Sequence, residues 1–291
     1  MNAQQTDLTT ELPAKPVTGL ALEVRGLQVA FPTRDGVVTA LDGLSIQAAP
    51  GEILGLVGES GCGKSTLGRL AVGLLPLTEG RRLWRGVPID GLAPAAARVQ
   101  QLRMQMIFQD PYASLNPRMR VVDIVGEAPV AHGIVSRRQQ VEYVGLQLNR
   151  VGLDPTLMRR FPHQFSGGQR ARDRDALATE PEFLVCDEPT SALDVSVQAQ
   201  VLNIMKDLQR SRGLTYLFIS HNLAVVRHVS DQVGVMYLGR LVELADKHTL
   251  FDSPRHPYTR MLIDAIPKMH DTGRARTPVS CILGIASISM R

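Results

Sequence analysis

The clearest chemistry lies in a glycine-rich stretch, residues 58–66, which reads GESGCGKST. An apolar run, 53–57, precedes it and a mostly apolar run, 67–71, follows, so the pattern predicts a strand, a loop and a helix. The N–H groups of such a loop can converge on phosphate oxygens, and the start of the helix adds partial positive charge. Lys64 would reach the terminal phosphates and Ser65 would bind Mg²⁺. The stretch therefore predicts a nucleotide-phosphate site.

Two further sets of polar residues follow predicted strands. Asp187 and Glu188 come directly after the apolar run 183–186, and His221 follows the run 216–220. In open α/β sheets, ligands bind at the carboxyl ends of the strands. Asp187 could hold Mg²⁺, directly or through water, and Glu188 could act as general base on an attacking water. Taken singly, the acidic pair could be an exposed turn and the histidine an ordinary surface or core residue.

The elements that must position these residues alternate between short apolar strands and helices. Residues 214–220 and 233–237 read as buried strands, and a helix with one apolar face ends near Gly213. Such alternation predicts a parallel sheet covered on both sides. A β-rich start precedes the phosphate stretch, and 123–160 shows helical spacing. The strands expected in that β-rich start are 21–24, 27–29, 38–41 and 44–46.

Length and composition exclude several classes of protein. The 291 residues, 44% hydrophobic and 21% charged, suit one large α/β domain with a smaller lobe. The formal charge is +4, and basic residues come in short pairs such as Arg81-Arg82, which favours solvated faces over a nucleic-acid track. Three cysteines are too few for a disulfide framework or zinc site, and Cys62 reads as space-filling. No signal or membrane-spanning pattern occurs, so membrane work would require partners.

Together these motifs resemble the nucleotide-binding subunit of ATP-binding-cassette (ABC) transporters over about residues 22–260. The resemblance lies in a signature at 165–170 (FSGGQR), a Q-loop at 108–110, a D-loop at 191–194 and a switch histidine, His221. It implies an α/β fold, a P-loop NTPase of the ABC type, with an antiparallel β subdomain and a helical signature subdomain.

The resemblance also implies roles for individual residues. Glu188, His221 and Gln109 would be catalytic, and Ser65, Gln109 and Asp187 would hold Mg²⁺. Phe31 resembles the aromatic residue that stacks on adenine, although a core position explains it nearly as well. The residues implied to contact ATP are Phe31, Gly58, Gly61, Gly63, Lys64, Ser65, Thr66, Ser166, Gly167, Gly168, Gln169 and Asp194.

Partners follow from the signature and from two further stretches. The amides after Ser166 would face the γ-phosphate of ATP on an opposing subunit, so two cassettes would pair. Residues 109–118 and 254–260 resemble the dipeptide and oligopeptide (peptide/nickel) importers. That resemblance implies permease subunits, a second cassette (heterodimer preferred, homodimer possible), an indirect solute-binding protein and no nucleic acid. The chain would be peripheral on the cytoplasmic face of a bacterial inner membrane. Solute choice would reside in the partners, so the sequence does not name the solute.

The expected organisation has three parts. Residues 1–19 read as a disordered leader, 20–252 as the ATPase domain, and 253–291 as a C-terminal extension with the HPYTR element. The helical subdomain is expected at about 110–170. A degenerate, non-hydrolysing cassette and a soluble ABC protein acting on nucleic acid or ribosomes are the alternatives. The single set of motifs favours the transporter reading.

Two segments depart from the resemblance. The spacing from Gln169 to Asp187 is eighteen, shorter than the family pattern, and 172–175 reads RDRD where apolar residues are expected. Each residue turns a helix by about 100°, so the shortening would carry Asp173 and Asp175 toward the sheet unless the helix starts later. Residues 280–291 match no family pattern. We hypothesise that both segments record small reading-frame changes, and impaired turnover is one expected consequence.

Overall fold

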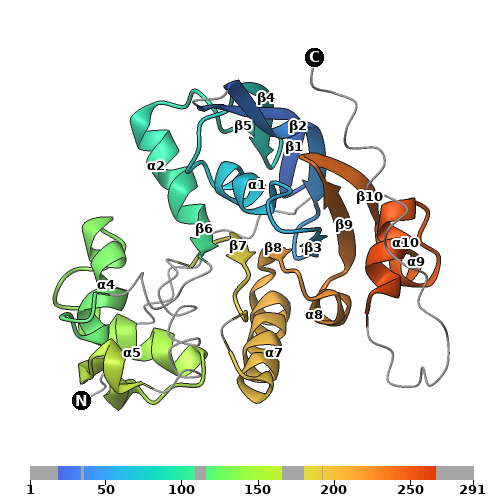
Figure 1. Ribbon diagram of the computed structural model, residues 1–291. Coiled ribbons are helices and arrows are strands. Elements are labelled where there is room, and N and C mark those ends of the chain that lie inside the picture. The colour runs from blue at the N-terminus through green and yellow to red at the C-terminus, as the bar shows by residue number, and fades with distance from the viewer. Residues whose placement is uncertain (1–18, 34–35, 109–115, 166–179, 192, 267–291) are drawn as a thin grey trace, which may run out of the picture.

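The computed structural model describes residues 19–33, 36–108, 116–165, 180–191 and 193–266 (Figure 1). Several sequence predictions lie outside these residues. They concern the leader, the signature residues Ser166, Gly167, Gly168 and Gln169, the Q-loop glutamine Gln109, the RDRD stretch and the tail.

A six-stranded sheet forms the centre of the molecule, in the order β10-β9-β3-β8-β7-β6. Its strands β6, β7, β8, β3 and β9 are parallel, and β10 joins the edge antiparallel to β9. Every residue of β3, β7 and β8 is buried, as the continuous apolar runs predict. The bounds are β3 Ile53–Val57, β6 Met104–Ile107, β7 Phe183–Asp187, β8 Thr215–Ile219, β9 Gln232–Tyr237 and β10 Arg240–Asp246.

Both faces of this sheet are covered, which confirms the predicted layering. Alternate residues of each strand point to opposite faces. Leu54 and Leu56 belong to the core shared with α1 (Lys64–Ala71), whereas Ile53 and Val57 join the opposite core. That opposite core takes in residues from α7 (Val195–Arg212), α8 (Leu223–Val229), α9 (Lys247–Asp252) and α10 (Pro257–Asp264). The helix predicted to end near Gly213 is α7, and Gly213 caps it in the left-handed conformation.

A second, antiparallel sheet has the order β2-β1-β4-β5. Its strands are β1 Leu22–Thr33, β2 Gly36–Ala48, β4 Glu79–Trp84 and β5 Val87–Pro88. The four short strands expected here are two long strands whose register shifts at irregularities. The prediction of solvated arginine pairs is wrong at Arg82, which is buried and forms an ion pair with Asp90. The ion pair with Asp90 offsets the free-energy cost of burying the Arg82 charge.

The two sheets meet at the carbonyl of Ala40, which lies on β2. A Cβ atom at Gly63 would be 2.6 Å from this oxygen, and one at Gly239 would be 2.8 Å from it. Both glycines also have positive φ, at 105° and 78°. The backbone of the antiparallel sheet therefore packs directly against the phosphate loop and the β9–β10 turn, and only glycine permits so close an approach.

The helical region predicted at 123–160 is confirmed, with two short 3₁₀ segments at its end. It contains α4 Val121–Ala131, α5 Gln140–Arg150, η1 Pro155–Arg159 and η2 Pro162–Gln164. Prolines open both 3₁₀ segments, as their fixed φ allows. The region has its own core of Val121, Val125, Val144, Leu148, Val151, Leu153 and Phe165. One further helix, α2 (Pro94–Arg103), precedes β6. In the described ranges, no helix combines the length and apolar character that crossing a membrane requires.

Candidate functional site

The predicted phosphate loop links the end of β3 to the start of α1. Gly58 has a φ of 150°, and a Cβ atom there would be 2.2 Å from the carbonyl oxygen of Met236 on β9. Gly63 is the N-cap of α1 in the left-handed conformation. The glycines at these two positions let the loop turn tightly between the central sheet and the helix, as the sequence predicts.

Lys64 lies inside this loop and is only 6% exposed. Its Nζ donates to the carbonyl oxygens of Gly58 at 2.8 Å and Glu59 at 2.7 Å, and contacts the Cys62 Sγ at 3.7 Å. The buried Cys62 fills space beside the ammonium, as expected. The loop's own carbonyls hold the Lys64 ammonium inside the loop, where its positive charge could stabilise the negative charge of a bound phosphate.

The start of α1 fits an anion as well. The N-cap Gly63 offers no side-chain hydrogen bond, so no side chain of the cap satisfies the first-turn amides, including those of Ser65 and Thr66. The helix has no acidic residue in its first turn. Amides at a helix start carry partial positive charge and bind phosphate well. These residues therefore fit the phosphates of a nucleotide.

Ser65 and Asp187 meet as predicted. The Ser65 Oγ donates to Asp187 Oδ1 at 3.0 Å, across 122 residues of chain. Burial raises the pKa of the Asp187 carboxyl above its ordinary value, and the Ser65 hydrogen bond opposes that rise. A hydroxyl beside a buried carboxylate suits Mg²⁺, which prefers hard oxygen ligands. Among the described residues, no group of three or more His, Cys, Asp or Glu side chains is placed to hold a metal ion. Phosphate and water oxygens commonly complete the coordination of Mg²⁺ in nucleotide sites.

Glu188 and His221, two of the predicted catalytic residues, lie together in the structure. Asp187 on β7 pairs with Ile219 on β8, so both chains leave the sheet at the same edge. His221 Nδ1 lies 3.1 Å from Glu188 Oε1, with the histidine side chain 64% exposed and the glutamate 18%. Glu188 has a φ of 49°, unusual for a residue other than glycine. Its N–H donates to the Ile219 carbonyl at 2.9 Å, which holds this turn in place.

Two other predicted site residues, Asp194 and Phe31, lie on different elements. Asp194 is the N-cap of α7, and its Oδ1 accepts the N–H of Val197 at 3.0 Å. Phe31 lies on β1 and is 41% exposed, so the core interpretation of this residue is wrong. An exposed aromatic face is what stacking on a base requires.

Sequence reasoning missed one contact of the loop. The hydroxyl of Tyr258, on α10, accepts the backbone N–H of Glu59 at 3.1 Å. The stretch that contains Tyr258 was notable only for its family resemblance, and nothing in its spacing points to the phosphate loop 199 residues away.

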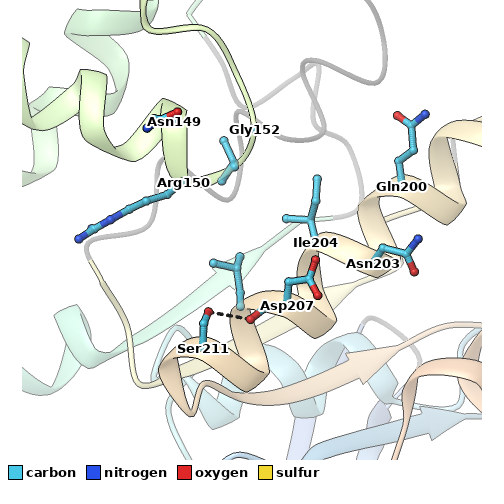
Figure 2. Close-up of a pocket in the computed structure, with 10 residues that line it drawn as sticks. Asn149, Arg150, Gly152, Gln200, Asn203, Ile204, Asp207 and Ser211 are labelled. Atoms are coloured by element: carbon cyan, nitrogen blue, oxygen red, sulfur yellow. Dashed lines mark hydrogen bonds between the residues drawn. The ribbon is translucent and has the colours of Figure 1, made fainter.

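A pocket of about 430 Å³ lies elsewhere, between the end of α5 and the side of α7 (Figure 2). In it the Ser211 hydroxyl donates to the Asp207 carbonyl. It is lined by Asn149, Arg150, Val151, Gly152, Gln200, Asn203, Ile204, Asp207, Leu208 and Ser211. None of these is a predicted nucleotide-site residue.

The fold and the loop together define a class of protein, the P-loop nucleotide-binding cassette of the ABC type. The ABC transporter family matches residues 41–191, and the family described as the oligopeptide/dipeptide transporter C-terminal region matches residues 242–280. A solved structure of cbiO1 from Clostridium perfringens, part of the ABC transporter complex cbiONQ, superposes with a TM-score of 0.71. It is 27% identical and the alignment covers 81% of this chain and 92% of that one.

Two curated relatives are considerably more similar in sequence. The oligopeptide transport ATP-binding protein OppF of Bacillus subtilis (strain 168) is 50% identical over 86% of this chain and 84% of its own length. AppF of the same strain, also an oligopeptide transport ATP-binding protein, is 48% identical over 88% and 80%. The chain therefore belongs to the ABC transporter ATP-binding proteins, in the oligopeptide/dipeptide transporter family.

Proposed function

We propose that this chain binds and hydrolyses ATP with Mg²⁺ and so energises the import of oligopeptides through a membrane transporter. The observation that carries this proposal is the joint placement of Ser65 with Asp187 and of Glu188 with His221. Both pairs lie where β3, β7 and β8 end, at 3.0 Å and 3.1 Å. The family and the two Bacillus relatives support peptide as the transported class.

Each residue would have one task. Lys64 and the amides that open α1 would bind the β- and γ-phosphates, and Ser65 and Asp187 would hold Mg²⁺. Bound Mg²⁺ would neutralise charge that develops on the transferred phosphoryl group. Glu188 would accept the proton of the attacking water, and His221 would orient the Glu188 carboxylate through the contact at its Oε1. Gln109 remains a predicted member of this site, and the signature residues Ser166–Gln169 remain predicted to face the nucleotide of an opposing cassette.

The proposed partners follow from family membership. The helical region α4–η2 would dock on permease subunits, and a second cassette would supply the opposing signature. We favour a heterodimer of cassettes, with the solute-binding protein acting through the permease. The likeness to cbiO1, which is part of a transporter complex, supports an assembly of this kind.

The test is Mg²⁺-dependent ATP hydrolysis by the chain, alone and in the complex isolated through a tag on this chain. Glu188→Gln should lower kcat by about 10²- to 10⁴-fold, the usual contribution of a general base, while ATP binding is retained. Unchanged turnover in this variant would remove Glu188 from the base role.

The matched control is Glu182→Gln, at the opposite end of the same strand. Glu182 pairs with Arg85 and Arg103 rather than with the predicted site, so this variant should keep normal turnover. ATP binding without turnover in the complete complex would favour the non-hydrolysing cassette. Recovery of nucleic acid or ribosomes in place of membrane subunits would favour the soluble ABC class.

A further inference from the structure

The C-terminal helix α10 touches the phosphate loop through one side chain. Tyr258 is 7% exposed, and its hydroxyl accepts the N–H of Glu59 at 3.1 Å. The helix lies beside β9 and β10, at the edge of the central sheet (Figure 1). The family region matched at 242–280 contains this helix, so a residue outside the matched ABC segment contacts the nucleotide loop.

The peptide unit that Tyr258 contacts is held at both ends. The N–H of Glu59 and the carbonyl of Gly58 belong to the same peptide group. Tyr258 accepts from that N–H, and the Lys64 Nζ donates to that carbonyl at 2.8 Å. Because a peptide group is planar, fixing its N–H also fixes the direction of its carbonyl. The tyrosine hydroxyl therefore sets one of the acceptors that hold the Lys64 ammonium.

Tyr258 is itself held by a chain of contacts from β10. The carboxylate of Glu243 accepts the backbone N–H groups of Arg255 at 2.8 Å and His256 at 2.9 Å. The Nδ1 of His256 then caps α10 by accepting the N–H of Tyr258 at 3.2 Å. These contacts fix the first turn of α10 relative to the sheet. They give a structural role to each residue from Arg255 to Tyr258, with Pro257 at the start of the helix.

The tyrosine ring has a second support on β9. The rings of Tyr258 and Tyr237 have centroids 4.4 Å apart and planes inclined by 43°. The residue before Tyr237, Met236, has the carbonyl oxygen that closely faces Gly58. The end of β9 and the start of α10 thus lie on the same part of the loop, residues 58–59.

The phenol remains a neutral group at physiological pH. Burial raises the pKa of Tyr258 to about 12; the backbone hydrogen bond from Glu59 opposes this rise, and the charge of the Glu59 side chain adds to it. A neutral hydroxyl accepts one hydrogen bond while keeping its own proton. Ionisation of the phenol therefore does not disturb the contact with the Glu59 N–H near neutral pH.

We infer that Tyr258 is a positioning residue of the nucleotide site, which orients the Gly58–Glu59 peptide and through it the Lys64 ammonium. This inference rests on the proposed ATP function of the loop. It makes the C-terminal region part of the nucleotide site rather than only a mark of the subfamily.

The test removes the hydroxyl and keeps the ring. Tyr258→Phe should raise the Kd and KM for ATP about 3- to 10-fold, the net worth of one hydrogen bond. Its kcat should stay within about 2-fold of the parent, because Glu188 and His221 are untouched. Tyr237→Phe is the matched control, since it keeps the same ring pair and no hydrogen bond from Tyr237 to the loop occurs among the described residues. This control should bind ATP normally, and the melting temperatures of both variants should match the parent.

Three results separate the inference from the proposed function. Normal ATP binding by Lys64→Ala would overturn the phosphate site itself. Loss of binding in Lys64→Ala together with an unchanged Kd in Tyr258→Phe would overturn only the role of Tyr258. An equal loss in Tyr237→Phe would show that the effect does not depend on the contact between the Tyr258 hydroxyl and Glu59, and would also overturn the positioning role.

Discussion

The phosphate end and the base end of the proposed nucleotide site are built differently. At the phosphate end Lys64 and Asp187 are 6% and 3% exposed, and each makes hydrogen bonds to neighbouring groups. At the base end Phe31 is 41% exposed on the antiparallel sheet. Charged hydrogen bonds are strongest where water is excluded, whereas stacking on an exposed ring contributes less. We therefore expect the proposed site to bind the phosphates more tightly than the base.

Among the variants of the two ends, removal of the Lys64 side chain should cause the largest loss of ATP affinity. Lys64→Ala should weaken ATP binding by about 10²-fold or more, since truncating one partner of a buried charged contact costs about 2–5 kcal/mol. The measurement is equilibrium titration with a fluorescent ATP analogue. Lys206→Ala is the control, because the Lys206 Nζ donates to the His228 carbonyl on the other side of the molecule's core. Equal losses of ATP affinity in the two variants would contradict the assignment of residues 58–66 as the phosphate loop.

Replacing Asp187 with asparagine should raise the stability of the folded chain but lower its activity. Burial raises the pKa of the Asp187 carboxyl, so this group ionises at a lower pH in the unfolded chain than in the folded chain. The charged carboxylate therefore destabilises the folded state, and this effect is fully present above the folded pKa. At neutral pH, Asp187→Asn should therefore raise the melting temperature of the nucleotide-free chain, by about 2–4 °C. The same variant should need at least about 10-fold more Mg²⁺ for half-maximal turnover.

The control for this prediction is Asp207→Asn, an exposed position on α7. It should change neither the melting temperature nor the Mg²⁺ requirement. A lower melting temperature in Asp187→Asn would mean that the Ser65 contact outweighs the burial of the charge.

The base end should respond least. Phe31→Ala should raise the Kd for ATP about 5- to 10-fold, since stacking of a base on an aromatic ring is worth about 1–3 kcal/mol and this ring is partly solvated. Val38→Ala is the control, because Val38 pairs with Phe31 across the two strands and is also exposed. A larger loss from Phe31→Ala than from Lys64→Ala would reverse the comparison between the two ends.

Much of the fold could be predicted from the sequence, for a definite physical reason. Strands β3, β7 and β8 are buried on both faces, so their residues are apolar without interruption and were predicted closely. Strands β4 and β10 were not predicted. They carry charged residues on partly exposed faces, as in Glu79–Trp84 and Arg240–Asp246, and such strands lack a clear apolar period.

Some residues of the site could likewise be predicted from the sequence, and one could not. Asp187 ends the buried strand β7, Glu188 and His221 come just after β7 and β8, and Lys64 opens the helix that follows the loop after β3. Parallel strands bring these ends to one edge of the sheet. Their proximity was therefore predictable from position alone. Tyr258 was not, because its contact with Glu59 depends on how the Glu243 carboxylate and the His256 cap orient a helix at the far edge of the sheet.

The junction at Ala40 has a consequence for how the protein's architecture is encoded. The oxygen that meets Gly63 and Gly239 is a main-chain atom, which any amino acid at position 40 would supply. The two glycines contribute by lacking a side chain. At this close backbone contact the sequence therefore specifies the two glycines but not the residue at position 40, whose side chain takes no part in it.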